Sequence, residues 1–347
     1  MASSPYSPSW RRGCCAAPGK GAAWPARGCL LHKGRVVAAI VPCHNEAGFV
    51  GDVLAAMPRV IDHIIVVDDA STDATFDEAE RVALHDSRVR VVRNEKNLGV
   101  GGAVVAGYRL ILESMPDVEV IFKIDGDGQM PLDRVPDLLD AIVEEGFDYA
   151  KGNRFLMGKE LGSMPGSRLF GNFVTTFLTK FSSGYWNIFD VQNGFTALSR
   201  GVLERLDLSR IHRGYFFEND MLVHLNAISA RVKDVPIPAI YGDEVSGVNI
   251  VSVGFTFPRL LIGRYWWRLY RKYMLYNLSP VAVFMLLGTI LFGFGAIFST
   301  YLWVRSIVSA SPTPTGTIMI ALVSVILGFQ LILQSVVLDI QESDRLR

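Results

Sequence analysis

Asp125-Gly126-Asp127-Gly128-Gln129 directly follows the apolar, largely β-branched stretch from Val118 to Ile124. The apolar stretch predicts a buried strand, and the acidic run stands at its carboxyl end. Two carboxylates one residue apart can face one hard divalent cation such as Mg²⁺ or Mn²⁺. Ligand crevices in open α/β sheets also lie outside the carboxyl ends of strands. The alternative is an acidic turn that only contacts solvent, because so short a pattern has little specificity by itself.

The chain around this stretch alternates between expected strands and helices. The expected strands cover residues 36–41, 61–67, 89–93, 118–124, 149–151 and 232–239. Helical stretches lie between them, which predicts an α/β fold with a mostly parallel sheet and helices on both faces. The glycine run at 99–102 does not match GxGxxG, the pattern of dinucleotide-binding folds. A Rossmann dehydrogenase is therefore disfavoured.

Composition narrows the class of protein further. The 347 residues include 34 basic and 34 acidic side chains, so no overall field attracts nucleic acid. Residues 1–34 are rich in Ala, Gly, Pro, Ser and Arg without an apolar period, which predicts disorder. The four cysteines lack the paired spacing of a zinc site, and a reducing, cytosol-facing environment is the simplest interpretation.

The C-terminal third becomes amphipathic and then continuously apolar. Residues 251–277 interleave arginine and lysine with tryptophan and tyrosine, as in segments that lie on an anionic membrane surface. Two uncharged runs within 278–338 are each longer than the about 20 residues that a bilayer span needs. We predict a hairpin of two transmembrane helices there. The positive-inside rule then places residues 35–277 and the tail 339–347 in the cytoplasm.

Four short motifs occur in a fixed order along the first half of the chain. They are Val41-Pro42-x-x-Asn45-Glu46, Val67-Asp68-Asp69-x-Ser71-x-Asp73, Asn97-x-Gly99 and Asp125-x-Asp127-x-Gln129. Together they resemble the family 2 inverting glycosyltransferases, which have the GT-A fold. The Asp-Gly-Asp-Gly-Gln form is most similar to the dolichyl-phosphate mannose synthase branch, which includes bacterial polyprenyl-phosphate glucosyltransferases. The resemblance implies a GT-A catalytic domain over residues 35–250.

This resemblance assigns roles on the donor side of the site. It implies that four residues lie along the base and ribose of a nucleotide-sugar: Pro42, Asn45, Glu46 and Asp69. It implies that three residues hold Mg²⁺ or Mn²⁺ on the donor diphosphate: Asp125, Asp127 and Gln129. Asp125 would also contact the donor, and Asp127 would be catalytic. A bound cation stabilises the charge that the leaving diphosphate gains. For Asn45 and Glu46, a helix-capping pair is the alternative.

The resemblance also implies an acceptor side around the reacting centre. Arg154, Arg168 and Asp190 match its arginine after a strand, its arginine on the next helix and its aspartate before a Gly-Phe pair. Arginine suits a phosphate because its fork binds two oxygens. For Arg168, a solvated helix face is the competing interpretation. Glu218 and Asp220 occur where related enzymes carry an acidic pair, although acidic residues at a helix start also complement the helix dipole.

The function implied is transfer of a hexose from a nucleotide-sugar to polyprenyl or dolichyl phosphate, by a multi-pass enzyme at the cytoplasmic leaflet. GDP-mannose, UDP-glucose and UDP-GlcNAc are all compatible donors, and pairing of two copies through the apolar helices is compatible with the sequence. A polysaccharide synthase acting on a sugar hydroxyl usually carries QxxRW, which residues 264–268 do not match. A sugar nucleotidyltransferase would have a glycine-rich loop in place of Asn45-Glu46. A non-catalytic GT-A membrane scaffold would be expected to have lost one of the two aspartates at 125 and 127.

Overall fold

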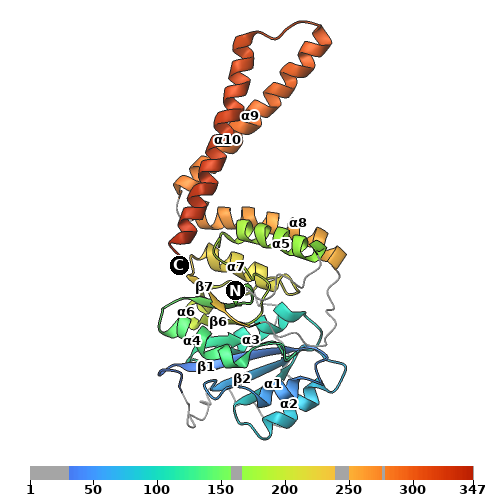
Figure 1. Ribbon diagram of the computed structural model, residues 1–347, viewed down its shortest axis with the longest axis vertical. Coiled ribbons are helices and arrows are strands. Elements are labelled where there is room, and N and C mark those ends of the chain that lie inside the picture. The colour runs from blue at the N-terminus through green and yellow to red at the C-terminus, as the bar shows by residue number, and fades with distance from the viewer. Residues whose placement is uncertain (1–30, 158–165, 239–249, 276–277, 347) are drawn as a thin grey trace, which may run out of the picture.

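The computed structural model describes residues 31–157, 166–238, 250–275 and 278–346, and a seven-stranded sheet forms the centre of this part of the chain (Figure 1). The strand order is β3-β2-β1-β4-β6-β5-β7. The strands are β1 (Val36–Cys43), β2 (His63–Asp68), β3 (Val89–Arg93), β4 (Val118–Lys123), β5 (Tyr149–Asn153), β6 (Thr196–Ser199) and β7 (Val232–Pro236). All neighbours are parallel except β6, which runs antiparallel to β4 and β5. The predicted mostly parallel sheet is confirmed, and β6 is an addition to the predicted strands.

Helices cover both faces of the sheet because its central strands are apolar on both sides. Alternate residues of β1 face two separate cores, with Val37 and Ala39 in one and Ala38 and Ile40 in the other. The first core lies under α1 (Val50–Ala55), α2 (Thr75–Ala83) and α4 (Val135–Val143). The second lies under α3 (Val100–Ser114), α6 (Arg200–Arg205) and α7 (Phe217–Ala227). Burying each such Val or Ile stabilises the fold by about 1.5–3 kcal/mol.

One edge of the sheet gathers the segments that carry the motifs. The parallel strands β1, β2, β4 and β5 all end at this edge, so the loops that follow them meet there. Because β6 is antiparallel, it begins at the same edge, and Thr196 pairs with Lys123 at the end of β4. The strand order also reverses direction between β1 and β4, the kind of switch point where open α/β sheets bind ligands.

Two helices form a layer beside the sheet, and two further helices form a hairpin that projects from that layer. Helices α5 (Gly166–Ser183) and α8 (Ile250–Leu269) lie side by side between the sheet and the hairpin (Figure 1). The remaining elements are the 3₁₀ turns η1 (Leu132–Arg134) and η2 (Phe155–Met157), the π-helical turn η3 (Tyr270–Met274), α9 (Pro280–Ser309) and α10 (Thr315–Asp344). Helices α9 and α10 are long and apolar enough to cross a membrane, and most of their apolar windows are exposed. Their lengths and composition fit membrane anchoring.

The two hairpin helices approach each other closely at small residues. A Cβ on Gly295 of α9 would lie 2.7 Å from the backbone nitrogen of Val325 in α10, which is closer than such contacts allow. Glycine therefore permits the close helix contact, as is common where helices associate in lipid.

The base of the hairpin is fixed to the sheet domain through a fully buried arginine. Arg268 forms a two-pronged ion pair with Asp339 of α10, with nitrogen–oxygen distances of 2.8 and 2.7 Å. It also donates to the carbonyl of Ser182 in α5 at 2.7 Å and to the amide oxygen of Asn226 in α7 at 3.1 Å. The Tyr273 hydroxyl also donates to Asp339 at 2.6 Å. These five residues, named here the Arg268 junction, hold the hairpin in a fixed relation to the sheet domain.

Candidate active site

The acidic run lies at the end of β4, and a buried lysine sits directly beneath it. Lys123 is 1% exposed, and its ammonium lies 2.7 Å from Asp125 Oδ1 and 3.1 Å from Glu218 Oε1. Burial alone would lower the pKa of Lys123, but the two carboxylates outweigh it and hold the pKa above its ordinary value. Lys123 therefore fixes Asp125 in place and joins it to α7. A lysine in an otherwise apolar strand, two residues before the acidic run, was a signal that the sequence interpretation missed.

The segment entering β6 closes over this lysine. A Cβ on Gly194 would lie 2.5 Å from Asp125 Oδ2, so only glycine fits between this loop and the acidic run. The motif position before Phe195 thus has a steric reason. The antiparallel β6 brings residues 190–195 against the acidic run, although they are far from it in sequence.

The two carboxylates of the acidic run fit a divalent cation that shares its coordination with a substrate. Asp125 Oδ1 is buried and, apart from its ion pair with Lys123, has no hydrogen-bond partner among the described residues. Asp127 Oδ1 accepts the backbone N–H of Gln129 at 3.0 Å, which orients that carboxylate. No group of three or more His, Cys, Asp or Glu side chains in the described part of the chain is arranged around a metal position. Mg²⁺ and Mn²⁺ commonly complete such two-carboxylate sites with phosphate oxygens and water.

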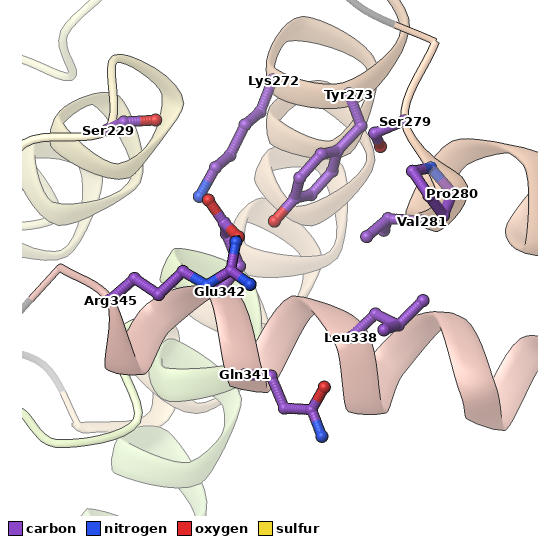
Figure 2. Close-up of a pocket in the computed structure, with 10 residues that line it drawn as sticks. All are labelled: Ser229, Lys272, Tyr273, Ser279, Pro280, Val281, Leu338, Gln341, Glu342 and Arg345. Atoms are coloured by element: carbon purple, nitrogen blue, oxygen red, sulfur yellow. The ribbon is translucent and has the colours of Figure 1, made fainter.

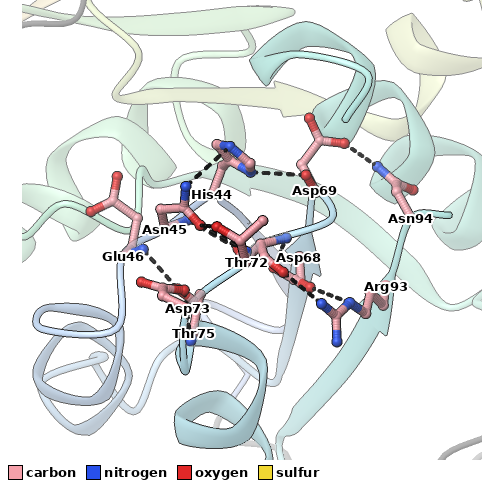
Figure 3. Close-up of polar contacts among 11 residues, drawn as sticks. His44, Asn45, Glu46, Asp68, Asp69, Thr72, Asp73, Thr75, Arg93 and Asn94 are labelled. Carbon is pink, nitrogen blue, oxygen red and sulfur yellow. Dashed lines mark hydrogen bonds and ion pairs between the residues drawn. The ribbon is translucent and has the colours of Figure 1, made fainter. Parts of the chain in front are cut away.

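The loops after β1 and β2 are joined to each other by hydrogen bonds (Figure 3). The side-chain oxygen of Asn45 accepts the backbone N–H of Thr72 at 2.9 Å, and the Glu46 N–H donates to Thr75 Oγ1 at 2.7 Å. Helix α1 starts without a side-chain cap, so Asn45 joins two loops and does not cap the helix. Asn45 also has φ of +59°, a left-handed conformation that asparagine tolerates well. Pro42 is buried within β1, where it pairs with Val67.

The two aspartates at the end of β2 have different partners (Figure 3). Asp68 is fully buried and pairs with Arg93 at 3.0 Å. Asp69 is 3% exposed and accepts the N–H of Leu98 at 2.9 Å and the amide of Asn94 at 2.7 Å. Asp69 thus holds the Asn97-x-Gly99 loop against the site, and a contact with a nucleotide base stays a prediction.

His44 bridges the same loops, and sequence interpretation gave it no role. Its Nδ1 lies 2.9 Å from the carbonyl of Asp69, and its Nε2 lies 3.1 Å from the side-chain nitrogen of Asn97. An imidazole that donates from Nδ1 and accepts at Nε2 satisfies both contacts. His44 therefore lies among the motif residues that the resemblance places around the donor base.

The acceptor side contains a paired arginine and aspartate. The guanidinium of Arg154, after β5, binds both carboxylate oxygens of Asp190 at 2.7 and 3.0 Å. Asp190 is buried, whereas 38% of the Arg154 side chain is exposed. Burial alone would raise the pKa of Asp190, but Arg154 and Lys151 outweigh it and hold the pKa below its ordinary value. An ionised carboxylate held this way is a weak proton acceptor, so Asp190 serves better to orient Arg154 than to remove a proton.

Buried polar residues form hydrogen bonds with the loop that carries Asp190. Lys151 is fully buried and donates to the carbonyl of Asn193, and burial lowers its pKa to about 8. Asn193 in turn donates to Asp190 at 3.2 Å. Asp234 of β7 accepts the N–H of Phe189 at 3.0 Å, and burial raises the pKa of Asp234 to about 6. The loop 189–193 is thus held on both sides.

The acidic pair at the start of α7 divides between two functions. Glu218 faces Lys123, and only 12% of its side chain is exposed. Asp220 is fully buried and binds Arg264 of α8 through both oxygens, at 2.7 and 2.8 Å, which links α7 to α8. Burial raises the pKa of Asp220 although Arg264 opposes the shift. Of the two, only Glu218 lies beside the acidic run. The side chain of Arg168 in α5 lies outside the described residues.

Comparison with known proteins agrees with this fold. Residues 38–207 match Glycosyl transferase family 2, and the chain belongs to that family. It is a glycosyltransferase with the GT-A fold. A solved structure of glucosyl-3-phosphoglycerate synthase from Mycobacterium tuberculosis, in complex with Mn²⁺, uridine diphosphate and phosphoglyceric acid, has a TM-score of 0.52. That similarity covers 68% of this chain and 79% of the other, at 20% identity, and supports the fold assignment.

The relatives in sequence indicate which kind of glycosyltransferase this chain resembles. The chain is 34% identical to a polyprenol monophosphomannose synthase of Mycolicibacterium smegmatis, over 61% of this chain and 80% of that protein. It is 31% identical to an undecaprenyl-phosphate mannosyltransferase of Micrococcus luteus, over 58% and 82%. It is 29% identical to a UDP-N-acetylglucosamine–dolichyl-phosphate N-acetylglucosaminyltransferase of Methanococcus voltae, over 66% and 96%. These relatives are named as polyprenyl-phosphate sugar transferases, the branch that the sequence motifs predicted.

Proposed function

We propose that the chain transfers a hexose from a nucleotide-sugar to polyprenyl phosphate at the cytoplasmic surface of a membrane, with inversion of the anomeric centre. The observation that carries this proposal is the Arg268 junction, which fixes the hairpin against α5, α7 and α8. Helix α7 begins with Glu218 beside the acidic run and ends near the hairpin base. A site held at a fixed position relative to a bilayer suits an acceptor whose chain lies in lipid and whose phosphate lies at the surface.

An apolar groove at the same junction supports a lipid acceptor. It has a volume of about 290 Å³ and lies where α5, α8, α9 and α10 meet. Its lining includes Leu178, Phe181, Leu261, Trp266, Met285 and Val336. The adjacent surface of α8 exposes Ile262 and Trp266, one helical turn apart. Isoprenoid units are apolar and branched, so this groove suits the part of the acceptor nearest its phosphate, and α8 would lie at the membrane surface.

The acceptor chemistry fits the side chains on the acceptor side. A phosphate monoester has a second pKa of about 6, so it is mostly dianionic at pH 7 and attacks without a general base. Its difficulty is repulsion from the donor diphosphate, which the exposed part of Arg154 would offset. Asp190 would keep the guanidinium aimed at the phosphate. Attack opposite the leaving diphosphate gives a β-linked product from an α-linked donor.

The donor diphosphate would lie over the acidic run. Asp125 and Asp127 would hold Mg²⁺ or Mn²⁺ there, with the backbone of Gln129 orienting Asp127. When bound, the cation stabilises the negative charge that develops on the leaving diphosphate. Lys123 would keep Asp125 in place through its ion pair. The loops that carry His44, Asn45 and Asn97 would surround the base, and GDP-mannose, UDP-glucose and UDP-GlcNAc remain the candidate donors.

The direct test is transfer into the lipid phase. Membranes carrying the full chain are incubated with polyprenyl phosphate and a panel of labelled nucleotide-sugars, and the organic extract is counted. We expect one donor to label the lipid, with a β-linked product by NMR. Asp127→Asn is the matched control, because it removes one anionic ligand with almost no change in shape, and we expect transfer to stop. Excess chelator should have the same effect on the unmodified chain. Label in a polymer, or a retained anomeric configuration, would contradict the proposal.

A further inference from the structure

A second cavity lies at the base of the hairpin (Figure 2). Its volume is about 360 Å³, and it is bounded by η3, the start of α9, the end of α10 and the turn after α7. Ser229, in that turn, lines the cavity, whereas Glu218 of the active site stands 11 residues earlier at the opposite end of α7. At 1.5 Å per helical residue the two lie about 16 Å apart. The cavity is therefore separate from the site of sugar transfer.

The polar lining of this cavity has an excess of positive charge. Lys272 and Arg345 line it together with the single carboxylate of Glu342. Figure 2 shows the Lys272 ammonium and the Arg345 guanidinium directed toward Glu342 from opposite sides. The neighbouring Arg268 and Asp339 neutralise each other. Arg345 and Glu342 form an ion pair at 3.3 Å, so about one positive charge, that of Lys272, is left for an anion to balance.

Lys272 is held in a way that favours an additional anion. Its ammonium donates to the side-chain oxygen of Asn226 at 3.1 Å, a neutral partner. Burial lowers the pKa of Lys272 to about 8, and the positive charge of Arg268 adds to that effect. An anion placed in the cavity would reverse both effects by compensating the buried charge.

The lining that faces the hairpin includes three apolar residues, Pro280, Val281 and Leu338, beside the polar Ser279 and Gln341. Val281 stands in the first turn of α9, and Leu338 stands near the end of α10. These residues begin and end the two apolar helices, so the cavity lies at the level where lipid headgroups would meet the protein. A ligand that suits it has an anionic group for the polar end and hydrocarbon for the apolar end.

We propose that this cavity binds the headgroup of an anionic glycerophospholipid, with its phosphodiester beside Lys272 and Arg345 and its acyl chains along the start of α9 and the end of α10. A phosphodiester carries one negative charge, which matches the excess of the cavity. The same geometry would let the lipid bridge the catalytic domain and the hairpin. This binding does not depend on sugar transfer, and it goes beyond the proposed function.

Lipid retention measures this binding directly. The full chain is reconstituted in phosphatidylcholine nanodiscs containing a small fraction of phosphatidylglycerol and released into mild detergent. Native mass spectrometry then counts the lipid retained. We expect one phosphatidylglycerol per chain for the unmodified protein. Lys272→Gln should weaken retention about fivefold, as for the loss of one basic side chain at a lipid headgroup. Glu342→Gln should strengthen it, because it removes the competing carboxylate.

Arg271→Gln is the matched control. Arg271 stands next to Lys272 in η3 and carries the same charge, but it does not line the cavity. Its substitution should leave retention unchanged. Arg345→Gln provides the second loss-of-charge variant if Lys272→Gln does not fold, because 80% of the Arg345 side chain is exposed. Equal retention in Arg345→Gln and the unmodified protein would then overturn the proposal, as would equal retention in a folded Lys272→Gln.

Two competition arms distinguish the source of the phosphate. Soluble glycerol phosphate should not displace the lipid at matched concentration, because it lacks the acyl chains. Polyprenyl phosphate should not displace it either, because the cavity is separate from the active site. Displacement by glycerol phosphate would make this a free-phosphate site, and displacement by polyprenyl phosphate would make it an acceptor site. Either result overturns the phospholipid assignment.

Discussion

Two arginine–aspartate pairs, each with two nitrogen–oxygen contacts, occupy different positions in this protein. Arg268 binds Asp339 at the hairpin base with both side chains buried, and its other donors are used by backbone and amide oxygens. Arg154 binds Asp190 at the carboxyl edge of the sheet with only the aspartate buried. Both pairs are two-pronged, and the clearest difference between them is the exposure of the arginine, from which we infer different roles. A buried pair holds elements together, whereas a pair with an exposed cation is prepared to receive an anion.

The largest expected effect is loss of transfer in Arg154→Ala. Removing one charged donor to a reacting phosphate costs roughly 10²–10³-fold in rate. Asp190 would keep its bond from Asn193 and the positive charge of Lys151 beside it, so the unfolding free energy should fall by less than the about 3–5 kcal/mol expected for a buried carboxylate left uncompensated. Initial rates of lipid labelling and thermal unfolding of the same preparation measure the two effects.

Arg154→Lys is the control for that variant. It keeps the charge and loses the two-pronged geometry, so its activity should fall between those of Ala and Arg. If Arg154→Ala instead unfolds the protein as Arg268→Ala is expected to do, the distinction between the two pairs fails.

Arg268→Ala should act on stability. Removing one partner of a buried ion pair leaves Asp339 uncompensated and costs about 3–5 kcal/mol. Thermal unfolding in lipid nanodiscs measures the change, with Arg271→Ala as a nearby control expected to stay within about 0.5 kcal/mol. Replacing both partners with apolar residues, as in Arg268→Met with Asp339→Leu, should recover much of the loss. No recovery would mean that the pair has a role besides joining the helices.

Asp190→Asn should have a smaller effect on rate than Arg154→Ala. Asparagine keeps one acceptor oxygen for Arg154, so we expect about a tenfold loss through poorer orientation of the guanidinium. The acid limb of the pH–rate profile should stay near pH 6, because it reports the acceptor phosphate and the pKa of Asp190 lies below its ordinary value. A profile whose acid limb disappears in Asp190→Asn would identify Asp190 as a general base.

Asp234→Asn should have the smallest effect on the rate of transfer. Its effect on the unfolding free energy should depend on pH. Burial raises the pKa of Asp234 to about 6 from an ordinary value of 3.8. The folded state therefore binds the proton more tightly than the unfolded state does. Deprotonation of Asp234 lowers the unfolding free energy of the protein as pH rises from about 4 to about 6. Asp234→Asn should stabilise the protein by about 2 kcal/mol more at pH 7.5 than at pH 4.5. Unfolding temperatures at the two pH values test the sign.

Features set by local sequence could be predicted in this protein, whereas features set by distant partners could not. The strands and motif loops were predictable because each is a local pattern, and the order of parallel strands brings their ends together. The predicted apolar run ended at Leu338 because Asp339 is charged, yet α10 continues to Asp344. Arg268 compensates that charge from 71 residues away, which no local pattern records. The role of Lys123 could not be predicted for the same reason, because its partner Glu218 is 95 residues away in the sequence. Strand β6 has only four residues, too few for a clear alternation.

The antiparallel strand β6 has a consequence for how such proteins diversify. Loops that would surround the proposed donor come from residues 44–129, and loops that would frame the proposed acceptor come from residues 154–218. The two blocks follow one another in the chain and meet at one edge, because β4 and β5 end there and the antiparallel β6 begins there. Recombination at a single crossover between them could exchange acceptor preference while keeping the activated sugar. One fold could thus supply many pairings of sugar and lipid carrier without rebuilding either half.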